Sequence, residues 1–392
     1  MSLNFQQVQI QVRQLGEKAP WREQRLKILR DQARDLLKSN AHDLSQLRQK
    51  VQLAAHSDPT LRCALPMVEH LETHAPAPSL PELATILAAD GSQIAPNRHA
   101  EVEYCLINVG TIQVCHGAAD PPRVTVNSQL FYDEELYTSG GMMSEASLAL
   151  LRDLNERKAL VELAKGAIKP VITFTDGPME LWGAKDGDAG DYQQKLEAYK
   201  DVLAQLCAQG VATAGYVDKP SANLVVRLLE VAMLPEEKLK EIRNQHPLRG
   251  VTDRDLFWDM LEPGERSAVF AMQSKSAANY PDELALRFFY LNVGRQGHSW
   301  LARVEVPDWV AGSEDLLSNL HAALVAQCRI MGNRPYPYLL HRAHEAAVVT
   351  LEEQEQVTQM IALELRKRGV SIGEESYKQA AKGLSGRTRY EG

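Results

Sequence analysis

Cysteine is scarce in this sequence, and no cysteine stands in a pattern that would give it a structural role. The five cysteines are scattered singly along the chain, at Cys63, Cys105, Cys115, Cys207 and Cys328. An odd, dispersed set argues against a disulfide framework or a zinc ribbon and is typical of reduced thiols. The sequence also lacks an apolar run near the roughly 18 residues that a membrane span requires. Its first residues lack the basic start and apolar stretch of a signal peptide. We therefore expect a cytoplasmic protein with no membrane contact.

Several catalytic signatures are absent too. The sequence has no G-x-x-x-x-G-K-[ST], which argues against a P-loop ATPase. It has no G-x-S-x-G and no H-E-x-x-H, the signatures of α/β-hydrolases and zinc proteases. Ser92 follows an Asp-Gly pair, but no further member of a catalytic triad is evident around it.

An excess of positive charge is missing as well. The 43 Lys and Arg are outnumbered by 51 Asp and Glu, for a net charge of -8. This balance argues against a nucleic-acid-binding surface that extends over the whole protein. It does not exclude a nuclease, which can bind phosphate through metal ions and a local basic surface.

What the chain does contain is an ordered alternation of secondary-structure signals. Residues 1–75 show apolar residues at helical spacing, and a proline-rich linker at 76–82 forbids helix. From residue 83 to 392 we expect one further domain. Strands are predicted at 84–90, 103–109, 111–115, 171–176, 211–217, 267–272, 285–292 and 299–306. Helices are predicted at 144–166, 191–209, 221–233, 253–261, 314–331 and from a capping box at Thr350 and Glu353. The alternation predicts an α/β fold with a mixed sheet.

Two of the predicted strands run into an Asp-Gly pair, at Asp90-Gly91 and Asp176-Gly177. In α/β sheets, ligand-binding groups collect at strand ends, and carboxylates from two ends could hold Mg²⁺ or Mn²⁺. The alternative is that both pairs are plain turns, because Asp-Gly is a common turn sequence.

Two further segments carry candidate chemistry. On the helix after residue 144, Glu156 follows Arg152 by one turn, either as a surface ion pair or as a third carboxylate at the site. Between Arg334 and Glu345, aromatic, basic and imidazole groups lie close together in the sequence, and His344 is a candidate metal ligand or proton-transfer group. The alternative for such a histidine is an ordinary packed or solvent-facing residue.

Short motifs in a fixed order extend from about residue 83 to the C-terminus. They are Ala89-Asp-Gly-Ser92, Arg152 with Glu156, Phe174-Thr-Asp-Gly-Pro178, Gly215-Tyr-Val-Asp-Lys-Pro-Ser221, Thr252-Asp-Arg-Asp-Leu-Phe257, Ala302-Arg-Val-Glu-Val-Pro307 and Tyr336-Pro-Tyr-Leu-Leu-His-Arg-Ala-His-Glu345. In this order they resemble the NurA family of DNA-end-processing nucleases, in a bacterial rather than an archaeal form.

The resemblance implies that residues 83–392 form a NurA-like nuclease domain, with an RNase H-like core and C-terminal helices. It implies a manganese-dependent 5′-to-3′ exonuclease and single-strand endonuclease, with Mg²⁺ as the alternative ion. It also implies a homodimer that works with a HerA-type hexameric ATPase in the resection of DNA double-strand breaks.

The resemblance also assigns the site. Asp90, Glu156 and Asp176 would be the metal-binding carboxylates, and His344 would complete the metal site. Tyr336 would lie close by, contacting DNA or orienting the metal ligands.

The assignment of the helical carboxylate stays open, because Glu145 and Asp153 lie within reach on the same predicted helix. Lys219 and Arg342 are candidate phosphate contacts. The alternatives to an active DNA nuclease are a non-catalytic DNA-binding or scaffold subunit of a translocase complex and a nuclease directed at RNA. The presence of aspartate in both Asp-Gly motifs favours the enzyme.

Overall fold

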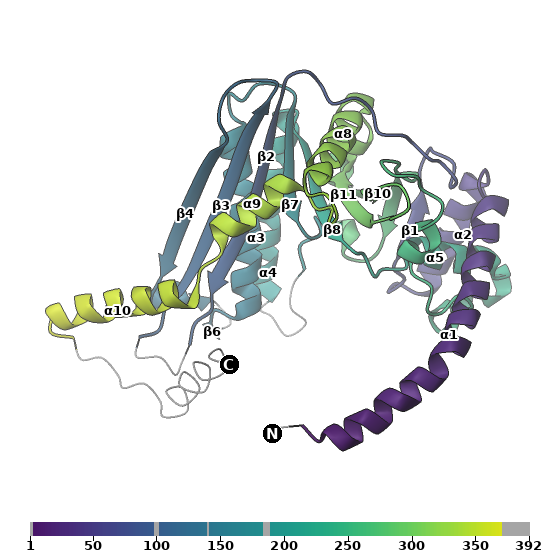
Figure 1. Cartoon of the computed structure of the whole chain (residues 1–392), viewed down its shortest axis with the longest axis horizontal. Helices are drawn as coiled ribbons and strands as arrows, with labels where there is room; N and C mark the ends of the chain where they lie inside the picture. The colour runs from purple at the N-terminus through teal and green to yellow at the C-terminus, as the bar shows by residue number, and fades with distance from the viewer. Residues whose placement is uncertain (1–2, 98–101, 139–140, 183–188, 371–392) are drawn as a thin grey trace. The chain divides into compact units, whose positions relative to one another are not determined.

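The computed structural model describes residues 3–97, 102–138, 141–182 and 189–370 (Figure 1). The chain forms two compact units, each assembled from separate stretches of sequence. Unit 1 comprises Met1–Ser79, Gly177–Met179 and Gly215–Pro335. Unit 2 comprises Leu80–Asp176, Glu180–Ala214 and Tyr336–Gly392.

Unit 2 is built on a mixed sheet (Figure 1). Its strands are β2 (Ala84–Ile94), β3 (Cys105–His116), β4 (Arg123–Phe131), β7 (Val171–Asp176) and the first residues of β8 (Ala212–Asp218). The spatial order is β8-β7-β2-β3-β4. Strands β2, β3 and β4 are antiparallel neighbours, whereas β7 lies parallel to β2. Helix α3 (Glu145–Ala164) precedes β7, and α4 (Ala189–Ala208) precedes β8. Three antiparallel strands followed by two strands that are each reached through a helix give the strand order of the RNase H-like fold, as predicted.

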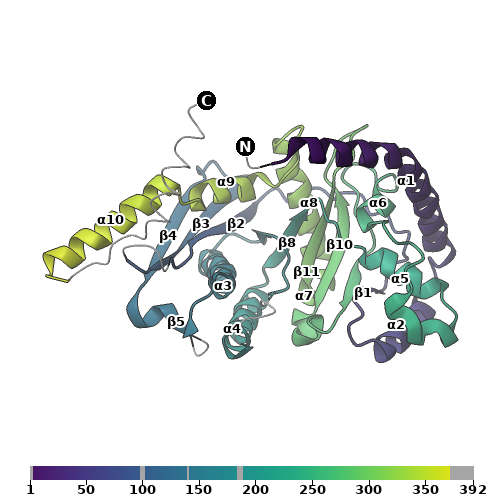
Figure 2. The same ribbon diagram turned by 90° about the horizontal axis from the view of Figure 1, so that it is seen from below.

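Helices lie on both faces of this sheet. Figure 2 shows α3 and α9 (Tyr338–Ala347) on opposite sides of β2 and β3. Helix α10 (Leu351–Lys367) begins at the predicted capping box, in which the Thr350 hydroxyl and the Glu353 carboxylate each bind the other's backbone N–H. The apolar side of α10 packs on Tyr104 and Leu106 at the start of β3.

Unit 1 carries an antiparallel arrangement of strands. In order these are β1 (Cys63–Pro66), β9 (Phe270–Gln273), β10 (Leu286–Asn292), β11 (Leu301–Pro307) and the last residues of β8. The helices of this unit are α1 (Phe5–Ser39), α2 (Leu44–Ser57), α5 (Leu224–Met233), α6 (Asp253–Phe257), α7 (Asp308–Ala311) and α8 (Glu314–Ile330). Its core includes the fully buried aromatic side chains of Phe257, Phe288 and Tyr290, packed with apolar residues of α2 and α5.

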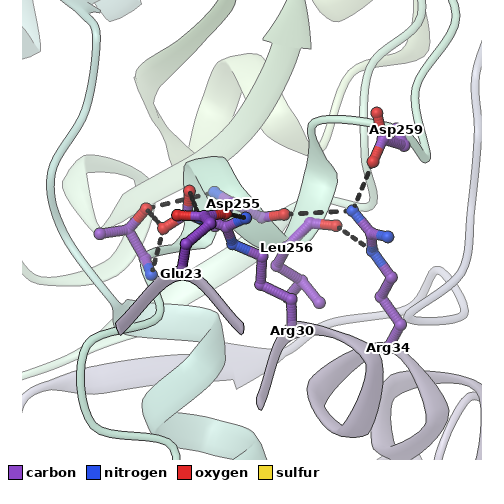
Figure 3. A network of polar contacts seen from close by, with 7 residues as sticks. Glu23, Arg30, Arg34, Asp255, Leu256 and Asp259 are labelled. Carbon is purple, nitrogen blue, oxygen red and sulfur yellow. Dashed lines mark hydrogen bonds and ion pairs between the residues drawn. The ribbon is translucent and has the colours of Figure 1, made fainter. Parts of the chain in front are cut away.

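Helix α1 joins unit 1 through its C-terminal half. Ala33 and Leu37 are its buried residues. The Arg34 guanidinium binds Asp259 at 2.9 Å, and Arg30 lies 3.6 Å from Asp255 at the start of α6 (Figure 3). In the N-terminal half, large apolar side chains such as Phe5, Ile10 and Trp21 are exposed.

The remaining short elements are β5 (Tyr137–Thr138), β6 (Gly141–Met142) and the 3₁₀ turns Asp133–Leu136, Glu236–Asn244, Ala277–Asn279 and Asp282–Leu284. Among the described residues, none of the helices combines the length and the apolar character that crossing a membrane would take.

The structure corrects the predicted strands at three points. The predicted strands 103–109 and 111–115 are one strand, β3, because Gly110 lies in extended backbone paired with Asp90 instead of ending the strand. Strand β4 was not predicted, because almost all of its residues are exposed and it lacks an apolar signal. Strand β1 lies inside the region that was predicted to be helical. The polar tail from residue 371 lies outside the described residues.

Candidate active site

Asp90 and Asp176 occupy neighbouring positions on two parallel strands. Ala89 of β2 is in register with Thr175 of β7, so each aspartate is the next residue on its strand. Adjacent strands lie about 4.8 Å apart, and residues in register share a face of the sheet. The structure therefore brings together two carboxylates that are far apart in the sequence.

The two aspartates end up there for different reasons. Asp176 is the last residue of β7, and Gly177 follows with φ of 81°, a left-handed backbone that glycine adopts readily. The prediction that Asp90 also ends a strand is wrong. Strand β2 continues through Gly91 to Ile94, paired with β3 along its whole length.

His344 binds the first of these aspartates. Its Nδ1 lies 2.6 Å from Asp90 Oδ2, where the ring nitrogen donates to the carboxylate. The Asp90 side chain is 15 % exposed, whereas the imidazole is 62 % exposed. This contact fixes one face of the imidazole and leaves Nε2 on the open side of the ring.

Helix α9 reaches this position because the strand beneath it has no side chain at one point. A Cβ on Gly110 would lie 2.7 Å from the Ala343 carbonyl oxygen and 2.7 Å from the Ala347 nitrogen. Asn108 Nδ2 donates to the Ala347 carbonyl at 2.8 Å, and the Ser92 hydroxyl donates to the same oxygen. Together these contacts hold the last turn of α9, which carries His344, against β2 and β3.

Tyr336 binds the second aspartate. Its hydroxyl donates to Asp176 Oδ1 at 2.9 Å. Pro335 and Pro337 flank the tyrosine and are both buried, so the approach to α9 is held in an extended conformation. The segment 336–344 thus supplies one polar partner to each aspartate.

Glu156 lies in a different environment. It projects from α3 with a side chain only 5 % exposed, and Arg152 Nε lies 3.4 Å from its Oε1. A Cβ on Gly91 would lie 2.8 Å from the same oxygen, so Gly91 makes the room for this carboxyl group. Burial raises the pKa of Glu156 to about 8, with the charges of Asp153 and Asp90 adding to the increase and Arg157 and Arg152 opposing it.

The alternation of side chains along β2 separates the two arrangements. Successive residues of a strand point to opposite faces, so Asp90 points to the face of α9 and Gly91 to the face of α3. This geometry explains why, across the part of the chain that the structure describes, no three His, Cys, Asp or Glu side chains converge to hold a metal ion. The carboxyls of Asp90 and Glu156 still interact electrostatically.

The other candidate residues have partners of their own. Asp153 forms a 2.8 Å ion pair with Arg152, and Glu145 is the exposed first residue of α3. Arg342 is paired with Glu345 on its own helix. Lys219, in unit 1, has φ of 44° and places its Nζ 4.3 Å from the centre of the Trp300 ring.

Sequence reasoning missed the two glycines that make the site possible. Gly91 and Gly110 are paired into strands and allow a helix or a helical side chain to approach from each face. A signal existed, since an isolated glycine inside a β-rich run indicates close approach of other groups to the backbone.

The strand order and the two aspartates in adjacent register place this chain in the class of RNase H-like proteins. The family model for the NurA domain matches residues 84–349, more than half of the chain. The chain therefore belongs to the NurA family.

The comparison with solved structures concerns the fold alone. The NurA nuclease from Sulfolobus solfataricus is similar, with a TM-score of 0.51 and 11 % sequence identity, over 84 % of this chain and 97 % of that one. The catalytic domain of human Endonuclease V matches with a TM-score of 0.34 and 14 % identity, over 82 % of this chain and 98 % of that one. No curated protein sequence matches the chain significantly.

Proposed function

We propose that this protein is a metal-dependent DNA nuclease, acting as a 5′-to-3′ exonuclease and a single-strand endonuclease. The observation that carries the proposal is the adjacent register of Asp90 and Asp176, each bound by a side chain from the segment 336–344. Membership of the NurA family and the fold shared with the Sulfolobus nuclease support it.

The donor set suits a divalent metal ion. Asp90, Asp176 and Glu156 offer carboxylate oxygens and His344 offers an imidazole nitrogen, a combination that Mn²⁺ accepts better than Mg²⁺ does. Burial first, and then the charges of Asp153 and Asp90, raise the pKa of Glu156, and a cation bound beside it would favour its charged form. When bound, the metal would activate water and stabilise the leaving oxygen of a phosphodiester.

The residues of the chain would orient that chemistry. The Asp90 carboxylate accepts from His344 Nδ1, so Nε2 is directed outward as a ligand or proton acceptor. The Tyr336 hydroxyl fixes the orientation of the Asp176 carboxylate. Glu156 approaches β2 from the other face, beside Gly91, and within the described part of the chain it makes no direct contact with the two aspartates. We include it in the site because its carboxyl group interacts electrostatically with that of Asp90.

The wider role follows from the family resemblance. We propose a cytoplasmic homodimer that acts with a HerA-type hexameric ATPase in resecting DNA double-strand breaks. Mixing the purified protein with such an ATPase and measuring co-elution and DNA degradation tests this part separately. Absence of a complex would confine the proposal to the nuclease itself.

A second candidate is a non-catalytic DNA-binding or scaffold subunit. The observation that favours it is the distribution of the carboxylates over two faces of the sheet instead of one convergent cluster. A third candidate, an RNA-directed nuclease, differs from the first in substrate alone.

The deciding experiment uses end-labelled single- and double-stranded DNA and an RNA of the same sequence, with Mn²⁺, Mg²⁺ or EDTA. The variant Asp90→Asn removes the charge with little change in shape. Asp120→Asn, at an exposed aspartate outside the site, is the matched control. We expect manganese-dependent DNA cleavage in the wild type and the control and none in Asp90→Asn. Cleavage that survives in Asp90→Asn would refute the assigned site, and no cleavage by any form would favour the scaffold.

A further inference from the structure

Unit 1 contains a cavity that is lined by none of the residues discussed so far. Its volume is about 370 Å³, and it is lined by polar and charged residues of α5 and of the segment 243–250. The lining residues are Asn223, Glu230, Arg243, Asn244, His246, Arg249 and Gly250.

The inner wall of the cavity is a closed ion pair. Glu230 is 1 % exposed and receives Arg227 Nη1 at 2.6 Å and the Leu248 backbone N–H at 2.9 Å. Arg227 also donates to the carbonyl oxygens of Gln245 and Ile242. These groups are satisfied by one another, so they shape the cavity and have little capacity left for a ligand.

The outer wall is different, because its two arginines are exposed. Arg243 and Arg249 are exposed, and within the part of the chain that the structure describes neither guanidinium makes a hydrogen bond or an ion pair. The nearby acidic group is Asp58, whose pKa is lowered first by the Thr60 hydroxyl and also by the charges of Arg243 and Arg227. Of the charged residues that line the cavity, Arg243 and Arg249 are therefore cationic, and the one carboxylate, Glu230, is already paired with Arg227.

The segment that carries these arginines is held in place by His246. Its Nε2 lies 3.1 Å from the Arg243 carbonyl oxygen, to which it donates, and its Nδ1 lies 3.2 Å from Arg227 Nη1, from which it accepts. The imidazole thus connects the backbone of Arg243 to the buried ion pair. Arg243 and Arg249 therefore belong to a segment, 243–250, that hydrogen bonds hold to α5.

We propose that this cavity binds a phosphate group, carried by a nucleotide or by a nucleic-acid strand, between Arg243 and Arg249. A guanidinium presents a planar fork of N–H donors that matches phosphate oxygens, and the amides of Asn223 and Asn244 add neutral donors. The volume stands at the lower end of the roughly 300–1,000 Å³ that small-molecule sites occupy. The site goes beyond the proposed nuclease function, since it uses none of the catalytic carboxylates.

The test measures binding without hydrolysis. Full-length Asp90→Asn protein in EDTA is titrated with inorganic phosphate, with dAMP, with a fluorescent single-stranded 12-mer and with an acidic peptide. In the same background, Arg243→Gln/Arg249→Gln is compared with Arg13→Gln/Arg22→Gln, which removes two exposed arginines of α1. A third form, Arg243→Lys/Arg249→Lys, keeps the charge and removes the fork.

We expect the Gln pair to weaken binding of the phosphate-bearing ligands about tenfold or more and the control pair to leave it unchanged. For the 12-mer, the slope of log K against log salt should fall by about 1.4, for two lost phosphate contacts. The Lys pair should bind with intermediate affinity. An effect on dAMP alone identifies a free nucleotide as the ligand, and an effect on the 12-mer identifies a strand.

Equal effects of the Gln pair and the control pair, or binding of the acidic peptide alone, would overturn the proposal. Thermal melting of each variant checks the fold, and the Lys pair keeps the test valid if the Gln pair melts early. Because cleavage is absent throughout, the result is independent of whether the protein proves to be a nuclease.

Discussion

Buried carboxylates of unit 1 and the carboxylates of the candidate site in unit 2 are held in opposite ways. In unit 1, Asp253 is fully buried and accepts from the backbone N–H groups of Val225 and Val226 and from the Tyr290 hydroxyl, at 2.6–2.9 Å. Glu305 likewise accepts from the Met179 N–H at 2.9 Å and from Arg303. These groups are saturated with donors.

At the candidate site in unit 2, Asp90 and Glu156 accept fewer hydrogen bonds. Asp90 has His344, and the buried Glu156 has an ion pair no closer than 3.4 Å. An ionised carboxylate can accept about four hydrogen bonds, and an unsatisfied one is costly to bury. The contrast indicates that Asp253 and Glu305 stabilise the fold, whereas the environment of Asp90 and Glu156 is the one that the proposed ligand-binding role would require.

The largest effect should come from Asp176→Asn. The change removes a charge from the proposed metal site but keeps the shape, so cleavage should fall by more than the roughly 10–100-fold that loss of an outer partner costs. Stability should change by less than about 1 kcal/mol, because the side chain is exposed. Rates on labelled DNA and urea unfolding measure the two quantities. Near-normal cleavage would place Asp176 outside the site.

The opposite outcome is expected for Asp253→Ala in unit 1. The change leaves two backbone donors and the Tyr290 hydroxyl buried without an acceptor, and it should lower the free energy of unfolding by about 3 kcal/mol or more. Asp255→Ala, which removes part of the capping box of α6 and a 3.6 Å ion pair with Arg30, should cost about 1 kcal/mol. Comparable urea midpoints for the two variants would show that the hydrogen bonds to Asp253 do not stabilise the fold.

A buried histidine of unit 1 should make the stability of the protein depend on pH. His321 in α8 is buried, and its Nε2 lies 2.8 Å from the Gly264 carbonyl oxygen. Desolvation lowers its pKa to about 4 from 6.5, so between these values the unfolded chain binds a proton that the folded chain does not. The contribution of His321 to stability should therefore fall as the pH drops from 6.5 to 4, by up to about 3 kcal/mol. The pKa values of Asp253 and Glu156, raised by burial to about 6 and about 8, contribute with the opposite sign over the same range.

Unfolding in urea at pH 7, 5.5 and 4.5 measures this slope. His321→Gln keeps a donor for Gly264 and should remove the His321 contribution, so the difference between the two proteins at each pH isolates that contribution. A slope that persists in His321→Gln would mean that other groups cause the acid sensitivity.

A smaller effect on rate is expected for Tyr336→Phe. The ring stays and the hydrogen bond to Asp176 is lost, so cleavage should fall about tenfold through less exact placement of that carboxylate. Tyr132→Phe, at an exposed tyrosine elsewhere in unit 2, is the control. Unchanged rates in Tyr336→Phe would show that Asp176 is placed by the strand end alone.

A small change in stability is also expected for Glu156→Gln. With a pKa of about 8 the Glu156 carboxyl is mostly neutral at neutral pH, so a neutral amide should change stability without metal by less than about 1 kcal/mol, while cleavage is lost. Glu305→Gln is the counterpart in unit 1 and should destabilise, since it weakens the pair with Arg303. Marked destabilisation by Glu156→Gln would make Glu156 a structural residue.

Much of the fold could be predicted from sequence because its signals are local. The end of β7 at Asp176, the capping box of α10 and the bounds of α3 to within two residues all follow from apolar spacing and from the residues at element ends. Strand β4 could not be predicted in this way. It is exposed on both sides, and its pairing with β3 rather than an apolar pattern defines it.

By itself, then, the sequence determined the α/β alternation, the positions of its helices and the residue types of the candidate site. The tertiary structure alone decided which of those residues meet. Asp90 lies within a strand and not at its end, its side chain points to the face of β2 opposite the one that Glu156 approaches, and Gly91 and Gly110 provide the space. The reason is physical: strand continuation, register and close approach depend on partners distant in the sequence, and no local pattern records them.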